Sequence, residues 1–161
     1  MKMNNTICID APKERVWAVL ADVVSVADWV EQIYQADYGS VQKHGVGTQR
    51  VCHLTGGITL EETWTEWEEG EFYTYEATGM PMIKEARNRW SVEEVNGQTF
   101  LTSNAELVPK GGVLGQIVVP IFRWWSTRLG SDSMARFKYL AENGRPYKGD
   151  GSDLPVASAT C

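Results

Sequence analysis

Hydrophobic and polar positions alternate at the start of the chain and then change to a helical period. Residues 3–10 show a period of two, with Ile7 and Ile9 on one face and Thr6 and Cys8 on the other, which predicts a strand. In residues 16–20 the apolar side chains recur at helical spacing, and Asp10 is placed to cap the helix that they predict. Ser25 resembles the first residue of a capping box, so residues 26–30 are expected to form a second, short helix.

The middle of the chain reads as a series of strands separated by turn residues. Asn96-Gly97 is the most specific turn, because both central residues of a type I′ hairpin need positive φ, which Asn and Gly tolerate best. The other links are also short, so antiparallel hairpins are expected. The expected strands cover residues 33–40, 47–54, 59–67, 72–78, 86–95 and 99–108.

A helical period returns in the last third. Apolar residues from 114 to 140 form one stripe, and Asn143-Gly144 is expected to end this helix. Pro120 lies inside the pattern and predicts a kink or an irregular first segment. Residues 145–161 are rich in Gly, Ser, Pro and Asp without periodicity. We therefore expect one domain over residues 1–144 and a flexible C-terminal tail over 145–161.

Composition and charge narrow the classes of protein. The 161 residues, 43% hydrophobic and 22% charged, are typical of a single globular domain that buries its own core. A net charge of −6 without clustered Lys and Arg predicts no nucleic-acid partner. The longest apolar stretch, 113–122, is too short for a span of about 20 residues, so no stable membrane insertion is expected. Three cysteines without short paired spacing, and no secretory signal, predict a cytoplasmic protein.

Several short motifs carry a family resemblance. They are Ile9-Asp-Ala-Pro12, Val16-Trp17-Ala-Val-Leu-Ala-Asp22 followed by Trp29, Val46-Gly-Thr-Gln-Arg-Val-Cys-His-Leu54 and Glu62-Thr-Trp-Thr-Glu-Trp67. Over about residues 3–143 the chain resembles the helix-grip superfamily of StAR-related lipid-transfer and birch-pollen-allergen proteins, in its polyketide cyclase/dehydrase branch. The resemblance implies an α+β fold: a curved, seven-stranded antiparallel sheet around a long C-terminal helix, with two short helices after the first strand.

A curved sheet that wraps a helix leaves a cavity wherever the facing side chains do not meet. Ser103 is a small hydroxyl where relatives in this branch often carry an aromatic residue, which should leave more room. From the long helix, Ile121 and Trp125 are added as candidate contacts, although core packing is the simpler role for a Trp there. Alternation assigns these strand side chains to the inner face: Arg50, Cys52, Leu60, Glu62, Trp64, Asn88, Trp90, Val92, Leu101, Ser103 and Ala105.

Arg50 and Glu62 fall on neighbouring expected strands with the same facing, close enough to pair. One interpretation is a structural ion pair without chemistry. The other is a catalytic or ligand-binding pair, in which Arg50 holds an enolate or carbonyl oxygen of a polyphenolic ligand. The resemblance supports the second, because aromatic cyclases place Arg and Tyr groups in this cavity.

Other chemistry has little support. Cys52 and His53 are adjacent in a strand and point to opposite faces, and His44 lies in an expected turn, so neither a metal nor another cofactor is expected. There is no Gly-x-Ser-x-Gly motif for a nucleophilic serine. In the acidic run that begins at Glu61, alternation puts Glu62 and Glu66 on one face, and a solvated sheet edge is expected.

Three functions follow from these observations. The first is binding of a small hydrophobic ligand, polyketide-like, lipid or quinone, by a monomer or homodimer. The second is an aromatic polyketide cyclase or dehydratase acting on a poly-β-ketone, with Arg50 stabilising an enolate. The third is a non-catalytic accessory protein for quinone or lipid handling.

Overall fold

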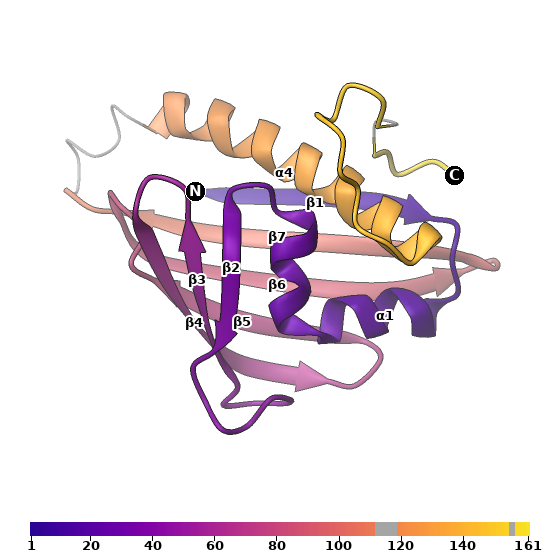
Figure 1. Ribbon diagram of the computed structural model, residues 1–161, viewed down its shortest axis with the longest axis horizontal. Coiled ribbons are helices and arrows are strands. Elements are labelled where there is room, and N and C mark those ends of the chain that lie inside the picture. Colours follow the sequence, from indigo (N-terminus) through magenta and orange to yellow (C-terminus); the bar gives the residue numbers. More distant parts are fainter. Residues whose placement is uncertain (112–118, 155–156) are drawn as a thin grey trace.

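A computed structural model describes residues 1–111, 119–154 and 157–161, and for residues 119–129 it describes the backbone alone (Figure 1). Strands and helices follow one another in the expected order. They are β1 (Lys2–Ile9), α1 (Lys13–Ala21), a 3-10 turn η1 (Val23–Ser25), α2 (Val26–Trp29), β2 (Ile33–Tyr38), β3 (Gln49–Leu54), β4 (Ile58–Glu68), β5 (Phe72–Thr78), β6 (Ile83–Val95), β7 (Gln98–Pro109) and α4 (Val119–Asn143).

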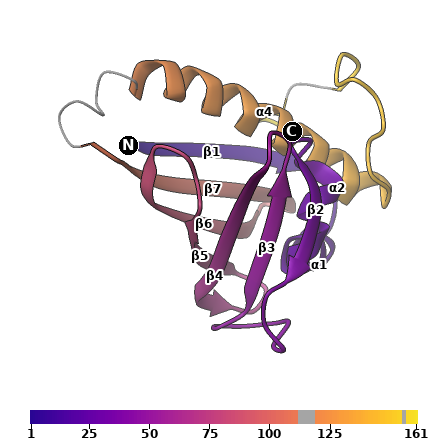
Figure 2. The same ribbon diagram turned by 60° about the vertical axis from the view of Figure 1, so that its left-hand side comes forward.

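The strands form one antiparallel sheet of seven strands in the order β1-β7-β6-β5-β4-β3-β2. Figures 1 and 2 show the sheet curving so that β2, β3 and β4 turn across β6 and β7, while α4 runs along the sheet near β1. The helices α1 and α2 close the remaining side of the concave face. The expected α+β helix-grip arrangement is therefore confirmed.

Two glycine positions explain why the chain turns where it does. Asn96 and Gly97 have φ of 53° and 76°, and Val95 pairs with Gln98, so the two-residue hairpin predicted between β6 and β7 is confirmed. Gly79, between β5 and β6, has φ of 89°, and a Cβ atom there would lie 2.2 Å from the carbonyl oxygen of Thr59. Any other residue at position 79 would collide with β4.

A bulge in β4 corrects one expectation. The register shifts between Trp64 and Glu66 where β4 pairs with β5. Glu62 consequently faces the inside of the sheet, whereas Glu66 lies on the outer face and pairs with Arg87 at 3.0 Å and Arg89 at 3.3 Å. Strict alternation put both glutamates on one face and was wrong, because a bulge adds one residue and reverses the facing beyond it.

The helix ends also differ from the sequence patterns. The N-cap of α1 is Pro12 and not Asp10, whose backbone N–H instead donates to Glu142. Ser25 is itself helical and makes no side-chain cap; its hydroxyl donates to the carbonyl of Val19. Both capping predictions were wrong: Asp10 lies two residues before the N-cap of α1, and at Ser25 the chain continues from η1 directly into α2.

The long helix ends as predicted, at Asn143 with Gly144 in the left-handed region at φ of 71°. Pro120 is its second residue, in the first turn, where the missing N–H has no partner to lose. The part of the expected stripe in residues 112–118 lies outside the described residues.

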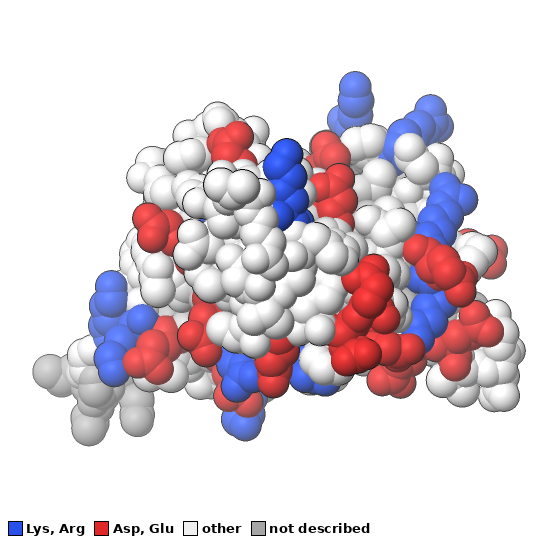
Figure 3. Space-filling view, turned by 90° about the horizontal axis from the view of Figure 1, so that it is seen from below, with Lys and Arg blue, Asp and Glu red and all other residues white. Residues whose placement is uncertain are grey.

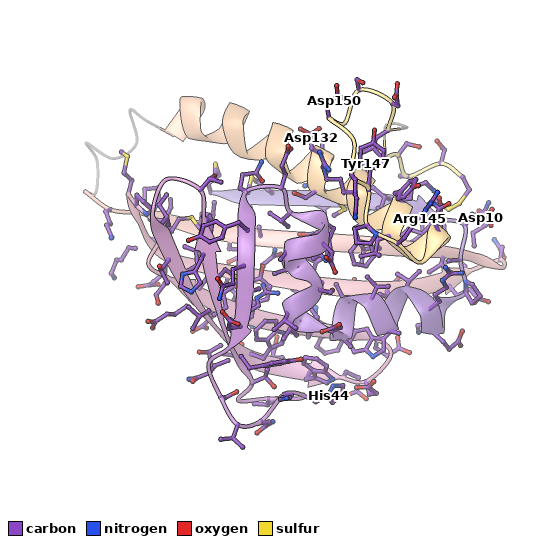
Figure 4. All side chains as sticks on the ribbon, in the orientation of Figure 1. Asp10, His44, Asp132, Arg145, Tyr147 and Asp150 are labelled. Atoms are coloured by element: carbon purple, nitrogen blue, oxygen red, sulfur yellow. A yellow bond between two sulfur atoms is a disulfide. The ribbon has the colours of Figure 1, made fainter. Side chains whose placement is uncertain are left out.

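The C-terminal segment returns to the body of the protein. Arg136 of α4 donates to the carbonyl of Tyr147 at 3.4 Å, and Figure 4 shows Tyr147 beside α4. The backbone N–H of Cys8 in β1 donates to the carbonyl of Ser158 at 2.8 Å, and Cys8 forms a disulfide with Cys161 at a Cα–Cα distance of 5.2 Å. The segment thus contacts α4 and β1, while its expected flexibility and the domain boundary at residue 144 stay predictions.

Candidate functional site

The concave face of the sheet encloses a cavity of about 480 Å³. It lies between the sheet and the helices α2 and α4, and residues of the β5–β6 loop also line it. Most of its wall is apolar. The apolar side chains of the wall include Met3, Val26, Trp29, Val30, Ile33, Leu54, Ile58, Leu60, Ala77, Met80, Trp90, Ala105, Leu107 and Met134.

Five of the polar side chains in this wall form a row across the sheet, and we call them the polar row. They follow consecutive strands across the sheet, from β3 to β7, because each is an inward position of its strand. Such a row lets an apolar cavity hold the oxygens of a ligand in a fixed orientation. The polar row consists of Arg50, Glu62, Tyr75, Asn88 and Ser103.

Arg50 and Glu62 form a buried ion pair at one end of the polar row. They are opposite each other in the β3–β4 register, and Arg50 Nε lies 2.5 Å from Glu62 Oε2. The Arg50 Nη1 group also donates to the carbonyl of Val23, in η1. Burial lowers the pKa of Arg50, but Glu62 opposes this, and the net shift is upward. The pair is 3% and 6% exposed, so each charge depends on the other for compensation.

Cys52 lies beneath this pair. Its thiol donates to Glu62 Oε2 at 3.4 Å, and burial raises the pKa of the thiol to about 12. A thiol with so high a pKa is neutral at physiological pH and is a poor nucleophile.

The other end of the polar row is a chain of hydrogen bonds. Ser103 donates to Asn88 Oδ1 at 3.0 Å, and Asn88 Nδ2 donates to the Tyr75 hydroxyl at 3.3 Å. The Arg50 guanidinium lies 5.7 Å from the centre of the Tyr75 ring, which joins the two ends electrostatically.

The sequence-predicted site residues are partly brought together. Arg50, Leu60, Glu62, Asn88, Trp90, Ser103 and Ala105 line the cavity. Cys52 and Trp64 face the same side but are 0% and 1% exposed and lie behind the residues that line the cavity, and their role as ligand contacts stays a prediction. Val92 and Leu101 are fully buried core residues. The side chains of Ile121 and Trp125 lie outside the described residues.

Sequence reasoning missed Tyr75, Trp29 and the methionines of the cavity wall. Alternation could have identified Tyr75, because it lies on the same face of β5 as the buried Tyr73 and Ala77. Trp29 comes from α2 and forms edge contacts with Trp90 at 5.6 Å, which no strand pattern can predict.

Both histidines lie away from the polar row. His44 is in the β2–β3 loop, well away from α4 in Figure 4, and its Nε2 lies 2.6 Å from Glu69. His53 contacts Thr59 on the outer face, opposite Cys52 as predicted. Within residues 1–111, 119–154 and 157–161, no group of three or more His, Cys, Asp or Glu is arranged to hold a metal ion.

Three further observations concern the surface and the helices. On the face seen in Figure 3, basic and acidic side chains lie among one another, and the side chains drawn there form no broad basic patch. None of the helices described is both long and apolar enough to cross a membrane. A second hollow of about 660 Å³, near Asp10, Glu94 and Lys138, has charged residues in its wall and lies apart from the polar row.

Comparison with known proteins gives one family. The family model for polyketide cyclase / dehydrase and lipid transport matches residues 1–142. Uncharacterized proteins of Mycobacterium tuberculosis and Mycobacterium bovis are 31% identical over 64 residues, which is 40% of this chain and 38% of theirs. The match thus spans about two fifths of the length of these curated relatives.

Solved structures show the same fold. The Zhui aromatase/cyclase from Streptomyces sp. R1128 superposes with a TM-score of 0.75 at 16% identity, covering 88% of this chain and 93% of that one. Ara h 8.0201 superposes with a TM-score of 0.66 at 13% identity, covering 88% of this chain and 97% of that one. At such identities the likeness is one of fold.

Proposed function

The chain belongs to the family of polyketide cyclases, dehydrases and lipid transport proteins, and from that membership we propose that it binds a small hydrophobic molecule in the cavity. The observation that carries the proposal is the wall of that cavity: apolar side chains surround about 480 Å³ and are interrupted by the polar row. A cavity of this size takes a molecule of a few fused rings or a short lipid.

Affinity and orientation would come from different parts of the wall. Burial of apolar ligand surface contributes about 25 cal/mol per Å² before the costs of association are subtracted. Trp29 and Trp90 offer flat faces that suit an aromatic ligand. Tyr75, Asn88 and Ser103 would orient the ligand by bonding to its oxygens.

A cyclase or dehydratase acting on a poly-β-ketone is the alternative. In that reaction an enolate carbon attacks a ketone carbon of the same molecule, the new alkoxide takes up the proton lost from the α carbon, and water is then eliminated. Arg50 would stabilise the enolate oxygen. Among the described residues its Nη2 group donates to no oxygen, which favours this role.

Binding without turnover is the better-supported function of the two. Arg50 is already compensated by Glu62 and by the carbonyl of Val23, so less of its charge is available to a developing oxyanion. A carrier or accessory protein for lipids or quinones needs only the cavity. A cytoplasmic location and a monomeric or homodimeric state stay predictions.

Native mass spectrometry of the freshly purified full chain tests the proposal. We expect a population with added mass, and extraction should release a hydrophobic small molecule: a polyphenol would favour the cyclase, and a lipid or quinone the carrier. The matched control is Ser103→Trp, which should carry no added mass because the new ring occupies the cavity. A ligand-free chain that also takes up no hydrophobic dye would contradict the proposal.

A further inference from the structure

The hydrogen bonds of the polar row all run in one direction. The Ser103 hydroxyl donates to Asn88 Oδ1, which leaves the Asn88 amide group to donate to the Tyr75 oxygen. The three residues belong to adjacent strands, β7, β6 and β5, so the sheet holds their spacing. Ser103 and Asn88 thus both donate in the direction of Tyr75.

The Tyr75 hydroxyl accepts the hydrogen bond that Asn88 Nδ2 donates. A phenol oxygen that accepts a hydrogen bond still carries one hydrogen of its own to donate. Among the residues that the structure describes, no protein group accepts that hydrogen, and Tyr75 lines the cavity. Its O–H is thus a donor that only a cavity occupant can satisfy.

The hydroxyl keeps its proton at physiological pH. Burial raises the pKa of Tyr75 to about 12, with a further upward contribution from Glu62, although Arg50 and the donors Asn88 and Trp90 lower it. Tyr75 is accordingly a hydrogen-bond donor over the whole range in which the protein would meet a ligand.

We propose that Tyr75 determines the specificity of the cavity, by selecting flat aromatic ligands that present a carbonyl oxygen to its hydroxyl. The proposal rests on the proposed binding function and names the ligand class. A hydrocarbon of the same shape would leave the buried O–H without an acceptor, which is the costly case for a polar group. The nearby Arg50 guanidinium adds favourable charge at the same place.

Equilibrium dialysis with two matched probes tests this. The probes are 2-acetylnaphthalene, which has one carbonyl oxygen, and 2-isopropenylnaphthalene, which replaces that C=O by C=CH2 and has nearly the same shape. We expect the native chain to prefer the ketone by about five- to tenfold, the range of one hydrogen bond. Tyr75→Phe should abolish the preference and leave the affinity for 2-isopropenylnaphthalene unchanged.

Two further variants sharpen the test. Tyr73→Phe makes the same change two residues away in β5, outside the cavity wall, and should keep the preference. Asn88→Asp places an acceptor of the same size beside Tyr75, so the hydroxyl should turn to the introduced carboxylate and the preference should disappear. Asn88→Asp thus occupies the hydroxyl hydrogen of Tyr75 without changing Tyr75 itself. Circular dichroism checks that each variant is folded.

The outcomes separate the two proposals. If neither naphthalene binds the native chain, the selection of flat aromatic ligands by Tyr75 is overturned; a native chain that also takes up no hydrophobic dye would overturn the binding function as well. If both probes bind the native chain equally well, or if Tyr75→Phe and Asn88→Asp keep the preference, the binding function stands and the role of Tyr75 alone is overturned.

Discussion

The concave face of the sheet is filled on one side and hollow on the other. In the filled part, Trp17 of α1 packs on Trp67, and Trp67 stacks on Tyr73 with ring centres 5.3 Å apart. In the hollow part, under α2 and the middle of α4, the same sheet borders the cavity of about 480 Å³. Two residues of one strand separate the parts: Tyr73 is 2% exposed in the filled part, while Tyr75 lines the cavity.

Side-chain volume on the facing surfaces accounts for the difference. Toward the cavity α4 presents Gly130 and Ser133, and β7 presents Ser103 and Ala105. Farther along α4, Phe137 and its neighbours Leu140 and Ala141 belong to the close-packed core. The helix-grip fold permits a cavity, but small residues on two elements create it.

The largest effect is expected for Trp64→Ala in the filled part. Trp64 is 1% exposed and packs on Tyr73 at 5.5 Å, so its removal should lower the free energy of unfolding by about 3–5 kcal/mol. Urea unfolding followed by circular dichroism measures this. A loss below about 1 kcal/mol would mean that the filled part is loosely packed.

Breaking the buried pair comes next. Arg50→Met leaves the Glu62 carboxylate uncompensated and should cost about 3 kcal/mol of unfolding free energy, much of which Arg50→Met/Glu62→Gln should restore. The matched control is Arg87→Met on the outer face, where the exposed pair with Glu66 should contribute less than about 1 kcal/mol. Equal losses at both sites in urea unfolding would remove the distinction between inner and outer pairs.

One substitution made in both parts compares them directly. Ala141→Leu adds three carbons where the chain is 0% exposed and close-packed, and should destabilise by about 1–3 kcal/mol. Ala105→Leu adds the same atoms toward the cavity and should change stability by less than about 0.5 kcal/mol. Thermal unfolding of the two variants measures the difference between their stability changes. Equal destabilisation would show that the space near Ala105 is not available.

The smallest effect concerns the rim of the filled part. The indole N–H of Trp67, then that of Trp17, and His44 all bond to Glu69 and lower the pKa of its carboxyl from 4.5. The stabilisation is therefore present above pH 4.5 and is lost as the pH falls through the lowered value.

Because Glu69 is largely exposed, Glu69→Gln should cost less than about 1 kcal/mol at pH 7. The difference from the native chain should shrink as the pH falls below 4.5, as melting temperatures between pH 3 and pH 7 would show. A difference that grows on acidification has the opposite sign and would rule out this role for the Glu69 carboxylate.

Sequence patterns predicted the fold closely and the site in part. Alternation located β5 at residues 72–78 without error and the β6–β7 hairpin by Asn96-Gly97, because both depend on local preferences. The start of β6 at Ile83 was missed by three residues, since a register shift between Ile83 and Glu85 breaks the alternation there.

Which residues form the cavity wall depends on contacts between segments that are far apart in the sequence. The pairing of Arg50 with Glu62 followed from facing and register. The contributions of Trp29 and Met134 depend on how α2 and α4 pack over the sheet, and the contacts of the C-terminal segment depend on Arg136 and Cys8, far away in the sequence. No local pattern encodes such contacts.

Dye binding to two neighbouring Trp variants tests the central claim most directly. Ser103 lines the cavity and Asn104, the next residue of β7, is exposed on the other face. Titration with 1-anilinonaphthalene-8-sulfonate should show binding to the native chain and to Asn104→Trp, and at least tenfold weaker binding to a folded Ser103→Trp. Equal dye binding by all three folded chains would contradict the account, because the hydrophobic site would then lie outside the cavity.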